Sequence, residues 1–515
     1  MSNLNHIIES QQELLAGLER TARGELKVPD LKPVSGVFGV IPQRNDLFMV
    51  RVRTTGGELA VSDMRFLAGL TARTRPGYIH LSTRQNIQIH DVTPTAAAET
   101  VRECTANGLP FRGGGGDSFR NVSSSIYAGV APDRSFDLAP FARYLTDTVF
   151  DWDEAFKLPR KLKIAFASPD DTALALRQDL GFVAAWDEDG NPGFTVYGGG
   201  GFGRNAATGI RLIDFIPPAR LARATRAMVD LFSEHGDRKN RGAARIRYIA
   251  ARLGDREFLK LYKQYYKALG KTKFPPVPKF PAAWNLKPTV RPVKNEQAET
   301  PDGYKRWRRF ACRRSRFRNE SSVMLFVPKG ILSVEEFGLL AELLNEFQIP
   351  AVRLTIEQNI LIPSLPSALL PEFYAALKKL PVDLTFASFR NQLNSCIGAA
   401  VCKVGILDVP PYATAAADAL DEYFRKHPTK FTAARTNAIV KGVHFSGCLN
   451  SCASHQVSRF GFQGTRKKIG EALQDGFTVW ENTENGPIGQ ENPEFIPAAE
   501  LPVIIIRMLK KGGLL

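Results

Sequence analysis

The stretch Gly56–Leu70, GGELAVSDMRFLAGL, decides the fold because a related stretch, KGILSVEEFGLLAEL, occurs at Lys329–Leu343. A second related pair, HLSTRQNIQIHDV at 80–92 and RLTIEQNILIPSL at 353–365, keeps the same separation of 273 residues. Three shorter pairs follow in the same order: SFRN at 118 and 388, GFTV at 193 and 476, and DFIPPARL at 214 with EFIPAAEL at 494. Related pairs that keep one order along the chain predict an internal duplication.

Each copy has the pattern of a strand, a helix and a second strand. LFMVRVR at 47–53 and SVMLFVP at 322–328 alternate as strands do. A helix-like run then begins at Ser62 or Ser333 with acidic residues behind it, and a second strand is expected over 78–90 and over 351–363. We therefore expect an α+β fold of two halves related by a pseudo-two-fold axis, joined through the proline- and lysine-rich stretch 271–305.

The composition is that of an ordinary globular protein, with 44% hydrophobic, 10% aromatic and 23% charged residues. The N-terminal residues lack the pattern of a secretory signal, and no 18-residue stretch is wholly apolar, so we expect a cytoplasmic protein without a membrane partner. The formal net charge of +16 predicts an anionic partner, and it leaves a nucleic acid, an acidic protein and a polyanionic cofactor as alternatives.

The first half carries cations that the second half lacks. At the separation of 273 residues, the counterparts of Arg51, Arg53, Arg84 and His90 are Met324, Phe326, Glu357 and Pro363. Because duplicated halves keep what folding requires, residues present in one half alone are candidates for function. Arg51 and Arg53 are two residues apart on an expected strand, which places both on one face.

More first-half cations follow further along the chain: Arg120, Arg160, Lys161, Lys163, Arg238, Arg241, Arg245 and Arg247. If KLKIAFA at 161–167 is a strand, Lys161 and Lys163 share one of its faces. The glycine run YGGGGFGRN at 197–205 fits a hairpin turn and a ligand loop equally well, and it lacks the GK[ST] ending of a phosphate loop.

The second half carries the thiols. NSCIGAAVCKVG places five residues between Cys396 and Cys402, and SGCLNSC places three between Cys448 and Cys452. A gap of five residues is unusual for a zinc site, whereas four thiolates suit a [4Fe–4S] cluster. The other two cysteines have no assigned role beyond apolar packing: Cys104 and Cys312.

At these residues the sequence resembles the sirohaem-containing sulfite and nitrite reductases, in which two cysteine pairs of this spacing bind a [4Fe–4S] cluster. The resemblance implies that the second of the pairs ends in a residue, Cys452, that also bridges to the sirohaem iron. It implies these cluster ligands: Cys396, Cys402, Cys448 and Cys452. GCLNSC matches the family's Gly-Cys-x-Asn-x-Cys element, which puts Asn450 among the cofactor-binding residues.

The resemblance also gives the first-half cations a role. The family binds its substrate anion with two arginines and two lysines, which implies the catalytic set Arg51, Arg120, Lys161 and Lys163. The residues implied to hold the carboxylates of sirohaem are Arg84, Gln88, His90 and Arg245. Because sirohaem is a polycarboxylate and the substrate is an anion, much of the positive excess has a partner.

The same resemblance implies limits for the domains. Ferredoxin-like half-domains are expected over 36–110 and 306–380, after an N-terminal extension over 1–35. A sirohaem-binding domain with the substrate-anion site is expected over 111–270, and a second such domain, which carries the cluster ligands, over 381–515.

The implied activity is the six-electron reduction of sulfite to sulfide at the sirohaem iron, with nitrite reduction to ammonia as the alternative. Sulfite is favoured because Lys161-Leu162-Lys163 has the Lys-x-Lys form, and a dianion gains more from the second lysine than a monoanion does. Electrons are expected from an acidic ferredoxin or a flavoprotein subunit, since no dinucleotide-binding fingerprint is evident. A basic iron–sulfur protein that binds nucleic acid is a remote alternative that leaves the duplication unexplained, so no nucleic-acid partner is expected.

Overall fold

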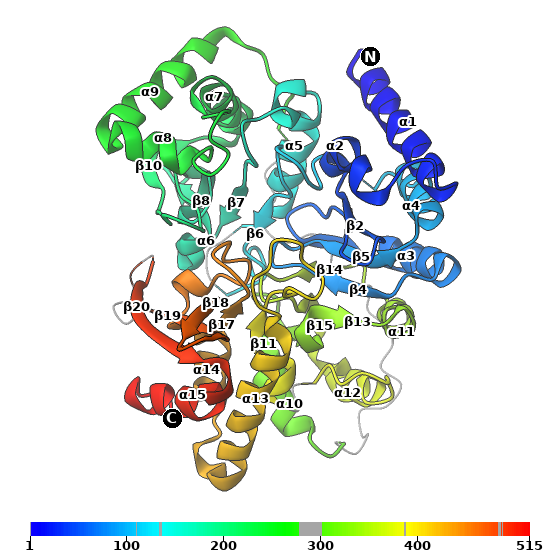
Figure 1. Ribbon diagram of the computed structural model, residues 1–515, viewed down its shortest axis with the longest axis vertical. Coiled ribbons are helices and arrows are strands. Elements are labelled where there is room, and N and C mark those ends of the chain that lie inside the picture. Colours follow the sequence, from blue (N-terminus) through cyan, green and yellow to red (C-terminus); the bar gives the residue numbers. More distant parts are fainter. Residues whose placement is uncertain are drawn as a thin grey trace.

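The computed structural model describes residues 2–109, 111–132, 136–277, 301–385, 388–482, 486 and 488–515, so most of the expected connector 271–305 lies outside the described residues. In Figure 1 the first half, blue to green, occupies the upper part of the view, and the second half, yellow-green to red, the lower part. Four five-stranded sheets organise the described chain. None of its described helices is both long and apolar enough to span a membrane.

Two of the sheets contain strands from both halves. The order of the first is β1 (Val40–Pro42), β2 (Phe48–Val52), β5 (Ile87–Val92), β4 (Tyr78–Leu81) and β13 (Ile331–Leu332). The order of the second is β11 (Cys312–Arg314), β12 (Glu320–Leu325), β15 (Ile360–Pro366), β14 (Ala351–Leu354) and β3 (Glu58–Ala60). Because β13 pairs with β4 and β3 pairs with β14, each half lends an edge strand to the sheet of the other.

The other two sheets repeat one topology, three parallel strands followed by two antiparallel ones. The first-half sheet has the order β6 (Ser123–Ser124), β7 (Ile164–Ala167), β8 (Leu180–Trp186), β9 (Pro192–Gly198) and β10 (Ile210–Ile216). The second-half sheet has the order β16 (Asn394–Ser395), β17 (Val443–Ser446), β18 (Phe460–Ile469), β19 (Ala472–Glu481) and β20 (Gln490–Pro497). The predicted duplication and α+β class are confirmed.

Helices flank these sheets in both halves (Figure 1). In the first half they are α1 (Ser2–Ala22), α2 (Lys32–Ser35), α3 (Val61–Thr74), α4 (Pro94–Ala106), α5 (Ala139–Phe150), α6 (Thr172–Leu176), α7 (Leu221–His235), α8 (Ile246–Leu253) and α9 (Asp255–Ala268). In the second half they are α10 (Tyr304–Ala311), α11 (Val334–Glu346), α12 (Leu370–Leu377), α13 (Val409–Lys426), α14 (Ala433–Gly442) and α15 (Leu501–Lys511). One hydrophobic core joins the two mixed sheets to the β16–β20 domain, while the β6–β10 domain has a core of its own.

Two buried glutamines lock the exchange of strands. Gln85 Nε2 donates to the carbonyls of Ser124 in its own half and Leu354 in the other half, both at 2.9 Å, and Gln85 Oε1 accepts from the Ser124 N–H at 2.8 Å. Gln358, the counterpart of Gln85, donates to the Leu81 carbonyl of the first half at 3.1 Å. Each glutamine therefore ties its own turn to a strand of the opposite half.

Arg353 adds a buried ionic link between the halves. Its Nη2 lies 2.7 Å from Asp137 Oδ1, and its Nη1 donates to the carbonyls of Ile126 at 2.9 Å and Ala128 at 2.7 Å. Removal of one partner of such a buried pair strands the other charge, which is strongly destabilising. Together with the exchanged strands, this link fixes how the halves are placed against each other.

Three expectations about local structure are wrong. The single strands expected over 78–90 and 351–363 are each two strands, because the chain turns between them through the left-handed backbone of Gln85 and Gln358, at φ 54° and 65°. α3 begins at Val61 rather than at Ser62, and its preceding residue makes no side-chain cap, whereas Ser333 caps α11 as expected. β7 begins at Ile164, so the two candidate lysines lie in the segment before the strand.

A substitution of Gln85 tests whether its amide stabilises the exchange of strands between the halves. In Gln85→Met, a change of similar size, three buried backbone groups lose their partner, so we expect the free energy of unfolding to fall by about 3 kcal/mol. Denaturant-induced unfolding of purified protein measures this loss. The control Gln264→Met changes an exposed position on α9 and should be nearly neutral. Equal stability of the two variants would contradict the role given to Gln85.

Candidate functional site

The four candidate cluster cysteines follow two parallel strands of one sheet. Cys396 comes directly after β16, and Cys448 lies two residues after β17. Because β16 and β17 are parallel neighbours, both cysteine-bearing segments leave the same edge of the sheet. The Cys396 N–H donates to the Phe445 carbonyl at 3.0 Å, and the Gly447 N–H donates to Cys396 Sγ at 3.1 Å. The fold thus brings together the two cysteine pairs that the sequence singled out.

The thiols of these segments influence one another's ionisation. Burial, with Cys452 and Cys448 nearby, raises the pKa of Cys396 to about 12. Burial also raises the pKa of Cys448, and Cys452 and Cys402 act in the same direction. Such thiols ionise beside a compensating positive charge, which bound iron supplies.

Gly447 lets the backbone of the two cysteine segments pack closely together. A Cβ on Gly447 would lie 2.5 Å from the Leu407 carbonyl oxygen and 3.6 Å from Cys396 Sγ, so a side chain does not fit there. Within the described ranges, no three Cys, His, Asp or Glu side chains lie close enough to share one metal ion. A [4Fe–4S] cluster does not need such a set, because its four thiolates bind different irons. The donors and their surroundings therefore fit a cluster.

Arg51 and Arg120 meet at the glycine loop 113–116. Both donate from Nη1 to the Gly114 carbonyl, Arg120 at 2.9 Å, and Arg120 Nη2 donates to the Gly116 carbonyl at 2.7 Å. Gln88, oriented with its amide oxygen toward Arg51, accepts from Arg51 Nε at 3.1 Å and from Nη2 at 2.7 Å. The two candidate anion-binding arginines are thus held side by side by neutral oxygens, and no carboxylate neutralises them in these contacts.

Lys161 and Lys163 stand half-buried in the segment before β7. Burial, followed by the charges of Arg245 and Arg120, lowers the pKa of Lys161 to about 7. Burial likewise lowers the pKa of Lys163 well below its ordinary value, with nearby cations acting in the same direction. A lysine with its pKa near neutrality can both hold a charge and release a proton at physiological pH.

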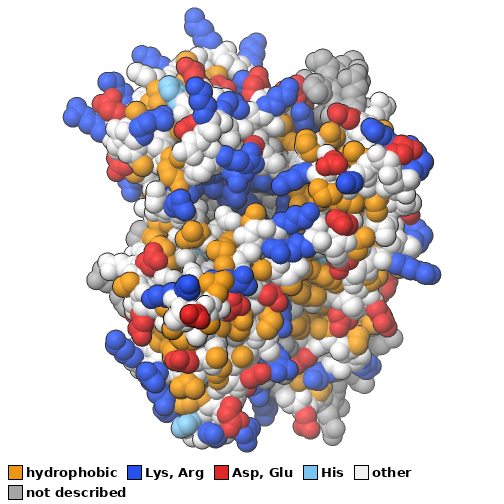
Figure 2. Space-filling model, in the orientation of Figure 1, with side chains coloured by type: hydrophobic (Ala, Val, Ile, Leu, Met, Phe, Trp, Pro, Cys, Tyr) orange, Lys and Arg blue, Asp and Glu red, His pale blue; other side chains and the backbone are white. Residues whose placement is uncertain are grey.

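Cys452 is where the two halves of the site come together. This exposed second-half thiol acts against the lowering of the pKa that burial causes in three first-half cations, Arg51, Lys161 and Lys163. It therefore lies within electrostatic range of the arginine and of both lysines. Figure 2 shows a hollow lined by Lys and Arg side chains on this face, over the region of β6, β7 and β8 in Figure 1.

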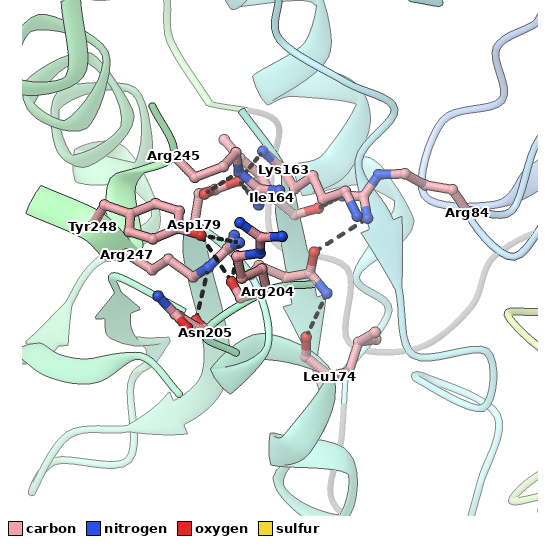
Figure 3. A network of polar contacts seen from close by, with 11 residues as sticks. Arg84, Lys163, Ile164, Leu174, Asp179, Arg204, Asn205, Arg245, Arg247 and Tyr248 are labelled. Carbon is pink, nitrogen blue, oxygen red and sulfur yellow. Dashed lines mark hydrogen bonds and ion pairs between the residues drawn. The ribbon is translucent and has the colours of Figure 1, made fainter. Parts of the chain in front are cut away.

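Asp179 is a buried carboxylate among these cations (Figure 3). Its Oδ1 accepts from Arg245 Nε at 3.1 Å and its Oδ2 from Arg245 Nη2 at 2.8 Å. Oδ2 also accepts from the Lys163 N–H at 2.8 Å. One carboxylate thus fixes both the Arg245 guanidinium and the backbone that carries the lysines.

Several buried guanidinium groups of the first half have donors without a partner among the described residues. Arg84 is held by Gln178 Oε1 at 3.1 Å and the Ile164 carbonyl at 3.3 Å, which leaves its Nε unpaired (Figure 3). Further buried donors without a partner in the described structure are Arg120 Nε and Arg247 Nη1. An unpaired buried donor is costly, and a polycarboxylate cofactor would satisfy such groups. The residues present therefore fit sirohaem.

Two of the residues predicted to bind a cofactor, His90 and Asn450, have less direct contacts with the other candidate residues. His90 is buried behind Gln88, stacked on Tyr78 with ring centroids 4.7 Å apart, and burial holds its pKa well below the ordinary value. It stays neutral, and Gln88 lies between it and Arg51. Asn450 is exposed and turns toward Cys448, where its backbone and side-chain hydrogen bonds lower the pKa of that thiol.

Sequence reasoning missed two residues that organise the site. Asp179 is the first, and no periodicity or motif distinguishes it from other acidic residues. Arg53 was noticed only as a cation, yet its side chain lies between the rings of Phe119 and Phe150, each 5.1 Å from its guanidinium carbon, and donates to the Arg120 carbonyl at 3.2 Å. Arg53 therefore helps to hold the backbone of Arg120 in place.

The Asp179 carboxylate gives a test of this arrangement. Asp179→Asn removes the charge but keeps the shape, so the buried Arg245 loses its ion partner and we expect the free energy of unfolding to fall by about 3 kcal/mol. Asp214→Asn, in the exposed pair with Arg211, is the control and should change it by less than about 1 kcal/mol. Matching unfolding curves for the two variants would refute the organising role of Asp179.

Comparison with protein families matches both kinds of domain seen in the fold. The nitrite and sulphite reductase 4Fe-4S domain matches residues 115–269, which is the first copy of the duplicated domain. The nitrite/sulfite reductase ferredoxin-like half domain matches residues 41–107 and 318–380, one stretch in each half.

Individual proteins agree with this result. The chain is 26% identical to the ferredoxin–nitrite reductase of Synechococcus elongatus over 474 residues, 90% of this chain and 85% of the relative. It is 24% identical to a sulfite reductase [ferredoxin] of Mycobacterium tuberculosis H37Rv over 418 residues, 81% of this chain and 70% of the relative. The fold is similar to that of the Mycobacterium tuberculosis NirA protein, with a TM-score of 0.77 at 22% identity over 97% of this chain and 93% of that one. The resemblance predicted from the sequence is confirmed: the chain belongs to the nitrite and sulfite reductase family, whose enzymes of this type carry sirohaem and a [4Fe–4S] cluster.

Proposed function

We propose that this enzyme reduces sulfite to sulfide, with electrons delivered one at a time by a separate donor protein. The observation that carries the proposal is that Arg51, Lys161 and Lys163 of the first half lie within electrostatic range of Cys452 of the second half. Arg120 adjoins this set, because it shares the Gly114 carbonyl with Arg51. A small, multiply charged anion is the substrate that such a set of cations would bind most strongly.

Each cofactor has its own candidate residues. The cluster would be held by Cys396, Cys402, Cys448 and Cys452. The carboxylates of sirohaem would be held by Arg84 and Arg245, with Gln88 between Arg51 and the buried His90. Asn450, beside Cys448, would contact the cofactors from the cysteine segment. When bound, the cluster would relay the electrons of the donor protein, and sirohaem would supply the iron at which the anion is reduced.

The cations of the chain would bind the anion and deliver protons to it. Arg51 and Arg120 would orient the substrate, since their guanidiniums stay charged and present fixed pairs of donors. Lys161 would release a proton from Nζ, because its pKa lies near 7. Each oxygen that leaves as water needs two protons, so a lysine that is recharged from solvent suits repeated steps.

Nitrite is the second candidate substrate. The relatives include both a ferredoxin–nitrite reductase and a sulfite reductase [ferredoxin] at nearly equal identity. Sulfite is preferred because Lys161 and Lys163 both stand beside Cys452, and a dianion gains more from the second positive charge. The names of these relatives and the net charge of +16 favour an acidic ferredoxin as donor, with a flavoprotein subunit as the alternative.

Substrate preference should depend on the second lysine. In Lys163→Asn, we expect the ratio of kcat/KM for sulfite to kcat/KM for nitrite to fall about tenfold, because the dianion loses the larger interaction. Turnover with reduced methyl viologen measures both values without a protein donor. Lys157→Asn, at an exposed position nearby, is the matched control. If the ratio in Lys163→Asn equals that of the control, the charge argument for sulfite fails.

The proton-donating role of Lys161 should appear in the pH profile. Burial lowers the pKa of Lys161 to about 7 in the free protein, and a bound polyanion raises this pKa. The lysine therefore loses its proton as the pH rises through about 7 or a somewhat higher value, and kcat should fall over that range. Lys161→Arg keeps the positive charge, but arginine does not release its proton at these pH values. The kcat of this variant should therefore be low, and the fall of kcat at alkaline pH should disappear. An unchanged fall of kcat in Lys161→Arg, matching that of Lys157→Arg, would assign the proton to another group.

A further inference from the structure

The glycine loop 199–205 passes between the cation half and the cysteine half. It joins β9 to β10, and its backbone is left-handed or extended beyond what side chains favour, with φ of 88° at Gly199 and 106° at Gly203. A Cβ on Gly201 would lie 3.2 Å from Arg245 Nη2 and from Arg247 Nη1. A Cβ on Gly203 would lie 3.7 Å from the Leu449 carbonyl oxygen of the cysteine segment. Bare backbone lets the loop lie against both sides at once.

The first half holds the end of this loop firmly (Figure 3). Arg247 donates from Nε to the Asn205 carbonyl at 3.0 Å and from Nη2 to the Arg204 carbonyl at 2.8 Å. The Tyr248 hydroxyl donates to the same Arg204 carbonyl at 2.9 Å. Both holding residues belong to α8, which begins directly after Arg245.

The second half grips the middle of the loop through Gln456. The Gly203 N–H donates to Gln456 Oε1 at 2.9 Å, and Gln456 Nε2 donates back to the Gly203 carbonyl at 3.1 Å. A side-chain amide carries both a donor and an acceptor, so it pairs with the N–H and the carbonyl of the same residue. Gln456 is 1% exposed, and its own carbonyl accepts from the Gly489 N–H at 2.8 Å, so the gripping residue is itself fixed.

Gln456 is only four residues beyond Cys452, and the segment between them is a series of tight turns. Ser451 and Ser454 have left-handed backbones, at φ 51° and 61°, and the Ser454 N–H donates to the Ser451 carbonyl at 3.0 Å. The Ala453 N–H donates to Ser446 Oγ at 3.2 Å. A displacement of Gln456 is therefore passed to Cys452 rather than absorbed by slack chain.

We propose that Gln456 is a positioning residue that sets where Cys452 stands relative to the cations of the first half. The inference rests on the proposed function, in which Cys452 bridges the two cofactors and the anion binds among Arg51, Arg120, Lys161 and Lys163. Gln456 reaches none of these groups itself and acts through the Gly203 peptide groups.

The test compares two buried glutamines of the same domain. Gln456→Met removes both bonds to Gly203 with little change in volume. Gln463→Met removes the bond from Trp480 Nε1, 3.2 Å long, and the contact with His455, both within the second half, and leaves the bonds to Gly203 in place. We expect Gln456→Met holoenzyme to retain both cofactors but to show an altered magnetic coupling between sirohaem and cluster in low-temperature EPR. Its kcat with reduced methyl viologen should fall about tenfold while KM for sulfite changes less than about twofold.

The controls separate this inference from a general loss of stability. Gln463→Met should keep the wild-type EPR signature and kcat, and the same result for Gln456→Met would overturn the proposal. If Gln456→Met yields no holoenzyme, Gln456→Glu replaces it in the test, because its carboxylate can still accept from the Gly203 N–H. An altered coupling in the EPR signal of Gln456→Glu, even a small one, supports the proposal. An EPR signal equal to that of the wild type overturns it. Absence of any coupled sirohaem–cluster signal in the wild type would instead refute the proposed function.

Discussion

The exchange of edge strands between the two halves is the constraint on which the rest of the molecule depends. β3 and β13 are too short to be stable alone, and the opposite half supplies the neighbouring strand of each, β14 for β3 and β4 for β13. Gln85 joins this exchange directly to the site domain, because one amide binds Leu354 of the other half and both backbone groups of Ser124 on β6. The placement of the cation segment against the cysteine segment follows from this connection.

The electrostatics of the site depend on which cations have a carboxylate partner and which do not. Asp179 is paired with Arg245, while Arg51 and Arg120 are held by backbone and amide oxygens and keep their charge available. Buried cations without carboxylate partners lower the stability of the free protein. An anion that binds only the folded state raises that stability again. Such a site favours anionic ligands, and Cys452 of the second half lies within electrostatic range of it.

The sequence was informative where a pattern repeats and uninformative where a contact depends on distant residues. The duplication, the one-sided cations and the paired cysteines were all visible, because comparison of the two copies exposes what differs. β13 has two residues, Ile331 and Leu332, which is too short for strand alternation to be recognised. Gln85, Asp179 and Gln456 are polar residues whose partners were unknowable from spacing; Leu354, for instance, is 269 residues from Gln85. The condition that 161–167 forms one strand is met only in part, because β7 begins at Ile164 and Leu162 forms an isolated parallel bridge with Phe119.

The measurement that tests the account most directly is kcat/KM for sulfite and for nitrite on the purified wild-type holoenzyme, with reduced methyl viologen as donor and the absorption spectrum recorded first. The account predicts a sirohaem spectrum and a higher kcat/KM for sulfite. A sirohaem spectrum with nitrite clearly preferred would contradict the role given to the two lysines in choosing a dianion. A protein that binds a cluster but no sirohaem would contradict the account of the site as a whole.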